Sequence, residues 1–559
     1  MAGGLLGIAT SGLMAAQRGL ATTGHNIANV NTDGYSRQRT EQVERLPSFT
    51  GAGFVGNGVD VASITRSYDS FLNAQLRSSL SAHGELETYH DMASQVDNFI
   101  ADPDASLSPS LQSFFNSVQD VVNDPTSIAA RRVMLTEGET LVQRLNTLNG
   151  RMDELRSQVN QSLSTNIDEI NGLARGIASL NERIVVAYNQ AGKPPNDLLD
   201  QRDLLTEQLA QKVGTSLFEQ KDGSLNVFIG SGQALVMGST ANQLSLQNSA
   251  YDPNQKDIAI TAGGSGSGAV VVTAAISGGE IGGLLRFGSE VLDPAQNALG
   301  RIAAGLAATF NAQHSLGSDL NGSAGADFFS DVTNAAIGQY SWFGRQTNSG
   351  NAILSVAFDN SAGNGSSDLT ASDYRLDYDG ANYTLTRLSD NTQFNNATGA
   401  FAIDGLAIGI GGGAVAAGDS FLIRPFRRVA GDLSVSLTDP REIAAAGSPF
   451  AGPGDNTNAR ALAQLQTLPS LLGGKASYQD AYNEIVGDVG TLTHAADIDS
   501  TAQKQLLDHA RQARDSVSGV NLDEEAANLL RYQQAYQAAA QLIPALNSMF
   551  DALIGAVRR

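Results

Sequence analysis

An apolar residue recurs every seven positions in the first thirty residues, and this repeat constrains the fold more than any other feature. One column of the repeat is Leu6, Leu13, Leu20 and Ile27. A second column, three residues further on, is Ala9, Ala16, Thr23 and Val30. The pattern predicts a helix over residues 1–33 that buries a narrow stripe against another helix. Gly34 follows in a Thr-Asp-Gly turn, where a helix end favours a left-handed residue.

The last forty residues carry a matching repeat. One column is Leu522, Leu529, Tyr536, Ile543, Phe550 and Val557, and the second is Tyr532, Ala539, Leu546 and Leu553. We expect the two terminal helices to pair, which makes everything between them a nested insertion. Pro544 lies inside the second helix and has no amide hydrogen, so a kink or a weakened turn is expected there.

Composition restricts the class of protein. A chain of 559 residues should form several domains. Its net charge of −22 argues against a nucleic-acid or anionic-membrane partner. It has no cysteine, which excludes a disulfide framework, thiolate zinc sites and thiol catalysis. There is no run of 18 apolar residues and no basic segment before an apolar core, so neither a transmembrane helix nor a secretory signal is expected.

Helical and strand patterns alternate between the termini. Residues 81–212 are predicted to be helical, with one long helix from Ser127 to Tyr188 capped by Thr126 and ended by the Gly192–Pro195 segment. Another helix is expected from Asn196. Residues 213–280 and 325–430 show the alternation and turn residues of strands, and the second stretch includes a hairpin from Tyr374 to Leu388.

Two further helical stretches are expected at 281–316 and 457–518. The second of these has an apolar seam that begins at Tyr478, and we predict that it packs against the 127–188 helix. The fold class is therefore α+β, multidomain and elongated, with the termini at one end and the β-rich lobes at the other. The predicted division is a terminal coiled coil (1–34 and 520–559), an inner helical bundle (35–212, 281–316 and 440–519) and an outer β-rich region of one or two lobes (213–280 and 317–439).

Several patterns superficially resemble chemical sites. Gly51, Gly53 and Gly56 match G-x-G-x-x-G, but no buried strand precedes them, so a glycine-rich hairpin is favoured over a nucleotide loop. A calcium loop at residues 373–380 has the wrong spacing, and His83 and His90 are two metal ligands without a third.

An acidic row in a predicted helix is the remaining candidate for a metal site. Asp197, Asp200 and Asp203 could form a metal cluster, but a solvated helix face that pairs with Arg202 is favoured. No nucleophile elbow, P-loop or H-E-x-x-H motif occurs. We therefore assign no catalytic, cofactor-binding or metal-binding residue and expect no enzyme activity.

The block GLMAAQRGLATTGHNIANVNTDGYSRQR, with GNGVDVASITRSYDSFLNAQLR after it, resembles the N-terminal signature of bacterial flagellar axial proteins, the rod, hook and hook-associated proteins. The residues that carry the match are Leu13, Asn26, Ile27, Ala28, Asn29, Asn31, Thr32, Gly34, Tyr35, Gly58, Val59, Val61, Ile64, Arg66, Asp69 and Phe71. A second matching block, SGVNLDEEAANLLRYQQAYQAAAQLI, lies at the other end. With NDLLDQRD, DYRLDYDG and GDSFLIRP, it resembles the hook-associated group that joins hook to filament.

The resemblance implies a structural role in a ring of subunits between hook and filament. The implied partners are the hook protein, a second junction protein and copies of the same chain, with an export chaperone that holds the C-terminal helix. The implied location is the extracellular flagellum, reached through the flagellar type III apparatus without a cleaved signal. The alternatives are another axial protein (second junction protein, hook or cap) and a surface-exposed adhesin or binding module.

The residues expected to carry assembly and packing come from both ends of the chain. They are Leu6, Leu13, Leu20, Asn26, Ile27, Asn29, Asn31, Gly34, Tyr35, Leu522, Leu529, Tyr532, Tyr536, Ile543 and Phe550. Because a pair of helices this size buries little surface alone, we expect both termini to be disordered in the monomer and ordered in the polymer.

Overall fold

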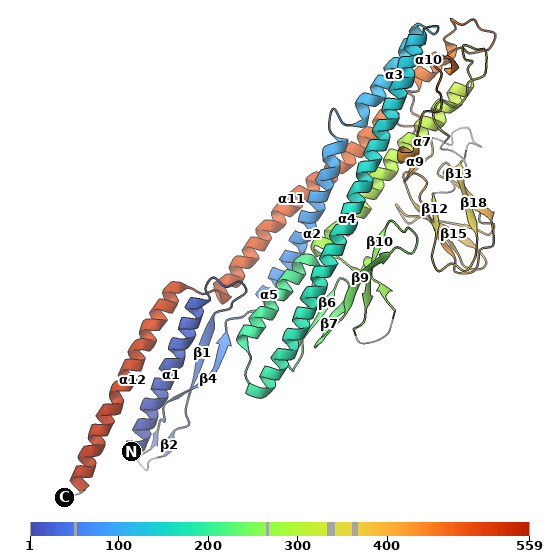
Figure 1. Cartoon of the computed structure of the whole chain (residues 1–559). Coiled ribbons are helices and arrows are strands. Elements are labelled where there is room, and N and C mark those ends of the chain that lie inside the picture. Colours follow the sequence, from blue (N-terminus) through green and yellow to red (C-terminus); the bar gives the residue numbers. More distant parts are fainter. Residues whose placement is uncertain (1, 50–52, 264–267, 332–340, 360–366, 558–559) are drawn as a thin grey trace.

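The computed structural model describes residues 2–49, 53–263, 268–331, 341–359 and 367–557. The molecule is elongated and α+β (Figure 1). Its helices are α1 (Ala2–Ala28), α2 (Ser70–Ile100), α3 (Leu107–Asn123), α4 (Ile128–Ala191), α5 (Asn196–Lys212), α6 (Gly279–Phe287), α7 (Asp293–Ser315), α9 (Val429–Asp432), α10 (Thr457–Gln464), α11 (Tyr478–Ser518) and α12 (Leu522–Val557). None of the helices in the described ranges combines the length and the apolar character needed to cross a bilayer.

The strands form antiparallel sheets in three regions. Near the N-terminus lie β1 (Gln38–Glu44), β2 (Ser48–Phe49), β3 (Phe54–Val55) and β4 (Val59–Arg66). The first β lobe contains β5 (Thr215–Glu219), β6 (Leu225–Ile229), β7 (Gln233–Met237), β8 (Thr240–Ala241), β9 (Gln243–Asn248), β10 (Lys256–Thr261) and β11 (Val270–Val271). The second β lobe contains β12 (Trp342–Gly344), β13 (Ile353–Phe358), β14 (Tyr374–Tyr378), β15 (Tyr383–Arg387), β16 (Gln393–Asn396), β17 (Phe401–Ile403), β18 (Leu406–Gly412) and β19 (Ser420–Ile423).

At one end of the molecule, α1 and α12 lie side by side and both termini are located there (Figure 1). A long hairpin covers another side of α1: β1 pairs with β4, so that Gln38 lies opposite Arg66, and β2 pairs with β3 near the tip. The predicted pairing of the terminal helices and the predicted hairpin are confirmed. Gly51 of the rejected nucleotide motif lies outside the described residues.

The end of the molecule that contains α1, α12 and the hairpin, which we call the terminal end, joins the rest of the chain through main-chain hydrogen bonds. The Arg37 amide donates to the Ser518 carbonyl at 2.9 Å, and the Ser67 amide donates to the Arg37 carbonyl at 2.7 Å. The start of the hairpin is therefore hydrogen-bonded directly to the last residue of α11.

A helical trunk of α2, α3, α4, α5, α7 and α11 forms most of the length. The seam of α11 packs along α2, and the prediction that it packs against the long 127–188 helix is wrong. The Tyr482 hydroxyl, for example, donates to the Ile100 carbonyl at 2.7 Å. The long helix α4 instead packs against α3, α5 and the first β lobe. Its Asn171 and Asn181 side chains form hydrogen bonds with main-chain groups of β9 and β6.

Local boundaries differ slightly from those expected. Ser127, rather than Thr126, caps α4 by accepting a hydrogen bond from the Ala130 amide, while Gly192 ends the helix at φ = 63° as a left-handed C-cap. The helix expected at 281–316 is two helices joined by a π-helical turn at Gly288–Leu292. Because α1 ends at Ala28, Gly34 (φ = 75°) belongs to the following turn and does not cap the helix.

The β lobes lie along the side of the trunk, and the trunk tip built from α3 and α10 extends beyond them (Figure 1). The expectation that the lobes form the far end is therefore corrected. In the second lobe the strands are ordered β12-β19-β14-β15-β16 in one sheet and β13-β18-β17 in the other. The predicted hairpin is β14–β15, with Tyr374 opposite Arg387.

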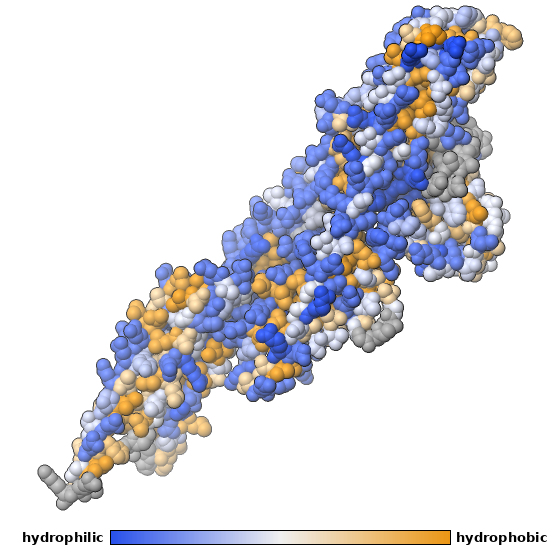
Figure 2. All heavy atoms as spheres, in the orientation of Figure 1, coloured by the Kyte–Doolittle hydropathy of each residue, from blue (hydrophilic) through white to orange (hydrophobic). Residues whose placement is uncertain are grey.

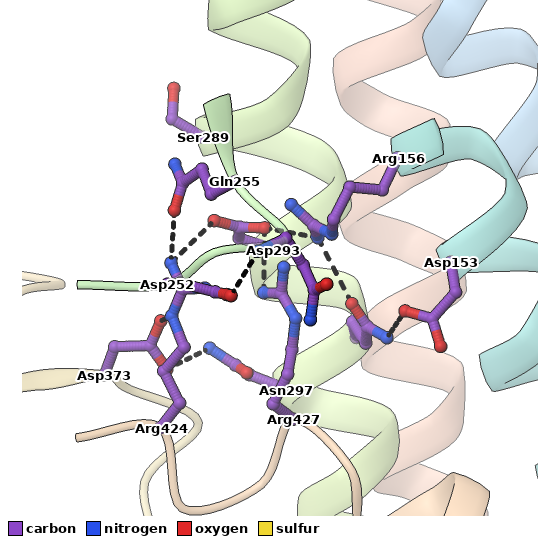
Figure 3. Close-up of polar contacts among 12 residues, drawn as sticks. Asp153, Arg156, Asp252, Gln255, Ser289, Asp293, Asn297, Asp373, Arg424 and Arg427 are labelled. Carbon is purple, nitrogen blue, oxygen red and sulfur yellow. Dashed lines mark hydrogen bonds and ion pairs between the residues drawn. The ribbon is translucent and has the colours of Figure 1, made fainter. Parts of the chain in front are cut away.

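Buried charges attach both lobes to the trunk (Figure 3). Arg424, just after β19, donates to Asp252 of the first lobe at 2.7 Å, and its Nε lies 3.1 Å from an oxygen of Asp373, just before β14. All three side chains are at most 10% exposed. The arrangement joins the end of one lobe to a loop of the other.

The same cluster reaches the trunk through Asp293, the first residue of α7. Arg156 of α4 and Arg427 donate to the same Asp293 oxygen at 2.6 and 2.8 Å. Burial alone would raise the pKa of Asp293, but Arg427, Arg156 and Arg424 hold that pKa well below its usual value. Asp293 is thus an ionised anchor for both α4 and the second lobe.

Candidate assembly interface

The contact between α1 and α12 is built from small residues on α1 and larger ones on α12. A methyl group at Gly19 would lie 2.7 Å from the Tyr532 ring, and one at Gly12 would lie 3.8 Å from the Ala539 Cβ. Ala16 and Thr23, on the same side of α1, are buried. The two helices approach closely because α1 offers almost no side-chain volume along this row.

Some of the packing residues predicted from the sequence lie in this contact, and others are exposed to solvent. On α12, Leu529, Tyr532 and Ile543 are half-buried, whereas Leu522, Tyr536 and Phe550 are exposed. Of the two α1 columns predicted to form the seam, the leucine column is the less buried: Leu6 is 43% exposed, and Leu13, Leu20 and Ile27 are half-buried. The Ala9, Ala16 and Thr23 column faces inward instead, because only small side chains fit the short distance between the helices. α12 continues through Pro544 without ending.

Asn26 links α1, the hairpin and α12. Its amide group donates to the Gln38 carbonyl at 2.9 Å and to Glu525 at 3.2 Å, and its side-chain oxygen accepts the Gln38 amide at 2.9 Å. The Tyr35 hydroxyl donates to the same oxygen at 2.7 Å. Burial raises the pKa of Tyr35, so this hydroxyl keeps its proton.

Arg37 completes the connection to α12. Its guanidinium group donates to Glu525 at 2.8 Å and to Glu524 at 2.6 Å. Glu525 is buried, with both oxygens hydrogen-bonded, and it lies in the first turn of a helix, where a carboxylate is stabilised by the helix dipole.

The acidic row of α5 holds the terminal end on the trunk. Asp200 accepts the Ser36 amide at 3.0 Å and Arg66 at 2.9 Å, and Arg66 also donates to Asp203 at 2.5 Å. Asp197 accepts from the Gln38 side chain at 2.8 Å. Burial raises the pKa of Asp200, an effect that the Arg66 guanidinium opposes.

The interpretation of that row as a solvated face paired with Arg202 is therefore wrong. Arg202 is buried and donates to Asn181 and to the Gly223 carbonyl. The partner of the acidic row, Arg66, is 134 positions from Asp200. Its presence in the N-terminal signature block was the only signal in the sequence.

The remaining signature residues shape the turn after α1. Asn29 donates to the His25 carbonyl at 3.0 Å, while Asn31 is exposed. A side chain at Gly34 would place its Cβ 2.9 Å from the Leu204 Cβ, so glycine allows the turn to approach α5. Within the described ranges, no group of three or more His, Asp or Glu side chains could hold a metal ion.

Apolar surface is exposed at this end of the molecule (Figure 2). The hairpin tip presents Leu46 (88% exposed) and Phe54 (74% exposed) beside Phe49. Between residues 526 and 557 the only charged residues are Arg531 and Asp551, in a chain of net charge −22. Uncharged apolar surface of this extent is typical of a protein–protein contact.

Comparison with known proteins identifies relatives over the whole length. Four family models match: "Flagella basal body rod protein" at residues 6–35, "Flagellar hook-associated protein FlgK helical domain" at 93–329, "Flagellar hook-associated protein 1, D2-like domain" at 346–425 and "Flagellar basal body rod FlgEFG protein C-terminal" at 511–556.

Individual proteins and a solved structure agree with the models. The chain is similar to flagellar hook-associated protein 1 of Salmonella typhimurium, at 38% identity over 98% of this chain and 99% of the relative. The Escherichia coli protein of the same name is 37% identical with the same coverage. The structure of the flagellar hook junction protein FlgK from Burkholderia pseudomallei superposes with a TM-score of 0.72 at 26% identity, over 79% of this chain and all of the other.

Proposed function

Since the chain belongs to the flagellar hook-associated protein 1 family, a family of structural flagellar proteins, we propose that it forms the ring that joins hook to filament. In this proposal it acts by packing and not by catalysis. Its terminal helices pair within each copy and bind neighbouring copies in the wall of the flagellar tube.

The exposed apolar surface of the terminal end is the observation that carries this proposal. Most of α12 is exposed although the helix is long and, from residue 526 onward, apolar and nearly uncharged. Contacts between different faces of identical subunits build rings or helical tubes, and in such a tube these faces gain the partners that they lack here.

We further propose the partners and the route of export. The hook protein and a second junction protein would bind on either side of the ring, and an export chaperone would hold α12 before assembly. Export would use the flagellar type III apparatus without a cleaved signal. The exposed side of α12 supports the chaperone proposal, because a helix face that does not pack against α1 is accessible to another protein.

The domain division and the assembly residues remain proposals on the same basis. The terminal coiled coil (1–34 and 520–559) would carry assembly, and the inner bundle and outer β-rich region would form the outer wall. Leu6, Leu522, Tyr536 and Phe550, exposed in the monomer, would become buried in the ring. We also propose that both terminal helices gain most of their stability on assembly.

A gene replacement tests the proposed function. In the source bacterium, the gene would be replaced by versions that lack residues 2–28, residues 520–559 or the second β lobe. We expect loss of motility, and filament protein shed into the medium, for both terminal deletions. If cells that lack the whole gene still assemble filaments on their hooks, the proposed function is wrong. Loss of surface binding only in the lobe deletion would favour a binding module.

A further inference from the structure

A second row of small and apolar residues runs along α12, away from α1. Its members are Ala535, Ala538, Leu542, Ala545, Met549, Ala552 and Ala556. The steps alternate between three and four residues, as in a heptad seam. All seven are exposed, with Leu542 at 51% and Met549 at 60%. We call this row the alanine stripe. It has the pattern of a helix contact, but no helix in the described part of the chain covers it.

A complementary row exists on α1. The leucine column (Leu6, Leu13, Leu20 and Ile27) has large side chains that are exposed or half-buried. Within one copy, small residues of α1 receive large residues of α12, as Gly19 receives Tyr532. In the leucine column and the alanine stripe the side-chain sizes are reversed, because α1 presents large side chains and α12 presents mostly alanine.

The two rows also match in length and in charge. Leu6 to Ile27 and Ala535 to Ala556 each cover three heptads, about 32 Å of helix. Neither row contains a charged residue. Although each copy has a net charge of −22, a contact between these two rows of neighbouring copies brings no like charges together.

The rows point to opposite sides of the helix pair. At about 100° per residue, the leucine column lies roughly 80° from the α1 row that faces α12. The side of α1 with Ser11 and Asn26, which bond to the hairpin, lies about as far away in the other direction. On α12, the alanine stripe lies about 120° from the inward row of Leu529, Tyr532 and Ile543. Because the two helices run antiparallel, the alanine stripe turns to the hairpin side, away from the leucine column.

We propose that the leucine column of one copy packs into the alanine stripe of the next copy. This inference rests on the proposed function and adds the residues that join neighbouring subunits. Since the two rows are different and lie on opposite sides, the contact is heterologous. It can therefore repeat from copy to copy and does not end in a closed dimer.

Disulfide cross-linking of assembled flagella tests the contact directly, because the chain has no cysteine. Leu13→Cys would be combined in one chain with Ala538→Cys, Leu542→Cys, Ala545→Cys or Met549→Cys. On oxidation, at least one pair should give a ladder of covalent oligomers. Leu13→Cys with Gln537→Cys is the control, because Gln537 is exposed but about 110° from the stripe. Dimers without a ladder, or no product from any of the four pairs, would overturn the contact.

A bulky substitution gives an independent readout. Ala545→Trp fills the stripe at an exposed position, so the purified monomer should keep the helix content and melting temperature of the wild type, while motility should fall to that of the deletion strain. Gln537→Trp should remain motile. Secretion of both variants at the wild-type level shows that export is intact. If Ala545→Trp assembles and swims normally while the deletion strain does not, this contact is wrong and the proposed function stands.

Discussion

The Asn26 amide donates to the Glu525 carboxylate at 3.2 Å across 499 sequence positions. The same side chain satisfies both main-chain groups of Gln38 and accepts from Tyr35. One buried amide thus sets the relative position of α1, the hairpin and α12.

Replacing this amide should loosen the terminal end. Asn26→Ala leaves the Gln38 N–H and carbonyl and the Glu525 carboxylate short of partners, at about 1–3 kcal/mol for each buried group left unsatisfied. We expect faster hydrogen exchange in α1 and α12 with unchanged exchange in α4. Asn31→Ala, at an exposed position of the same signature, should behave like the wild type. Equal exchange in both variants would contradict the role given to Asn26.

Two glycines of α1 form a matched pair for testing the helix contact. Gly19→Ala places a methyl group 2.7 Å from the Tyr532 ring and should destabilise the α1–α12 pair. A methyl group at Gly24 would meet no described atom within 4 Å, so Gly24→Ala should stabilise α1 by roughly 0.5–1 kcal/mol through helix propensity. Limited proteolysis near the termini should become faster for the first variant and slower for the second. A shift in the same direction for both would refute the close contact.

Arg66 should be needed to hold the terminal end on the trunk. Arg66→Met leaves Asp200 and Asp203 next to each other without their cation, and removal of one partner from a buried ion pair costs about 3–5 kcal/mol. We expect rapid cleavage by protease between the hairpin and α2. Arg45→Met removes an exposed pair with Asp60 in the same hairpin and should change little. A double Arg66→Met, Asp200→Asn variant should recover part of the resistance.

The charged cluster around Arg424 should hold both β lobes in place. Arg424→Met leaves Asp252 and Asp373 buried without their shared cation. Hydrogen exchange should rise in β9, β10 and β14 and stay unchanged in α11. Arg441→Met, which breaks an exposed pair with Asp439, serves as the control. Unchanged exchange in both lobes would show that apolar packing alone holds them.

His314 should make stability depend on pH. Its Nδ1–H donates to the Ala326 carbonyl and its Nε2 accepts the Ala444 amide, so the buried ring is neutral, and burial lowers its pKa from 6.5 to about 4. Unfolded chains bind the proton below pH 6.5, whereas the folded chain does not until about pH 4. Stability from this group is complete above pH 6.5 and falls by about 3 kcal/mol as the pH drops to 4. Denaturant titrations at several pH values should show this slope, and His314→Gln should flatten it.

The long helices, the hairpins and the pairing of the termini could be predicted because each shows a regular spacing of apolar residues over a short stretch of sequence. The partner of α11 could not, because an apolar seam such as that of Tyr482 and Ile485 fits any helix with a complementary face. The unequal burial of the two predicted α1 columns could not be predicted for a related reason. Heptad spacing marks apolar rows, but only the short distance between α1 and α12 selects the small row with Gly19.

Most of the polar site was also hidden from local patterns. Asp200 and Arg66 look like ordinary surface charges until the chain brings them together. The signature blocks indicated that Asn26, Tyr35 and Arg66 matter, and the structure adds the contacts that each makes.

The hydrogen bond from Arg37 to Ser518 has a consequence for the order of folding. In an unfolded chain, joining Asn26 to Glu525 closes a loop of almost the entire sequence. Once the trunk has placed Arg37 beside Ser518, only the short arms to Asn26 and Glu525 remain to be closed. The entropic free-energy cost of closing the loop then falls by about 3 kcal/mol. The trunk thus acts as a template for its own ends, and the terminal helices should find each other last and quickly.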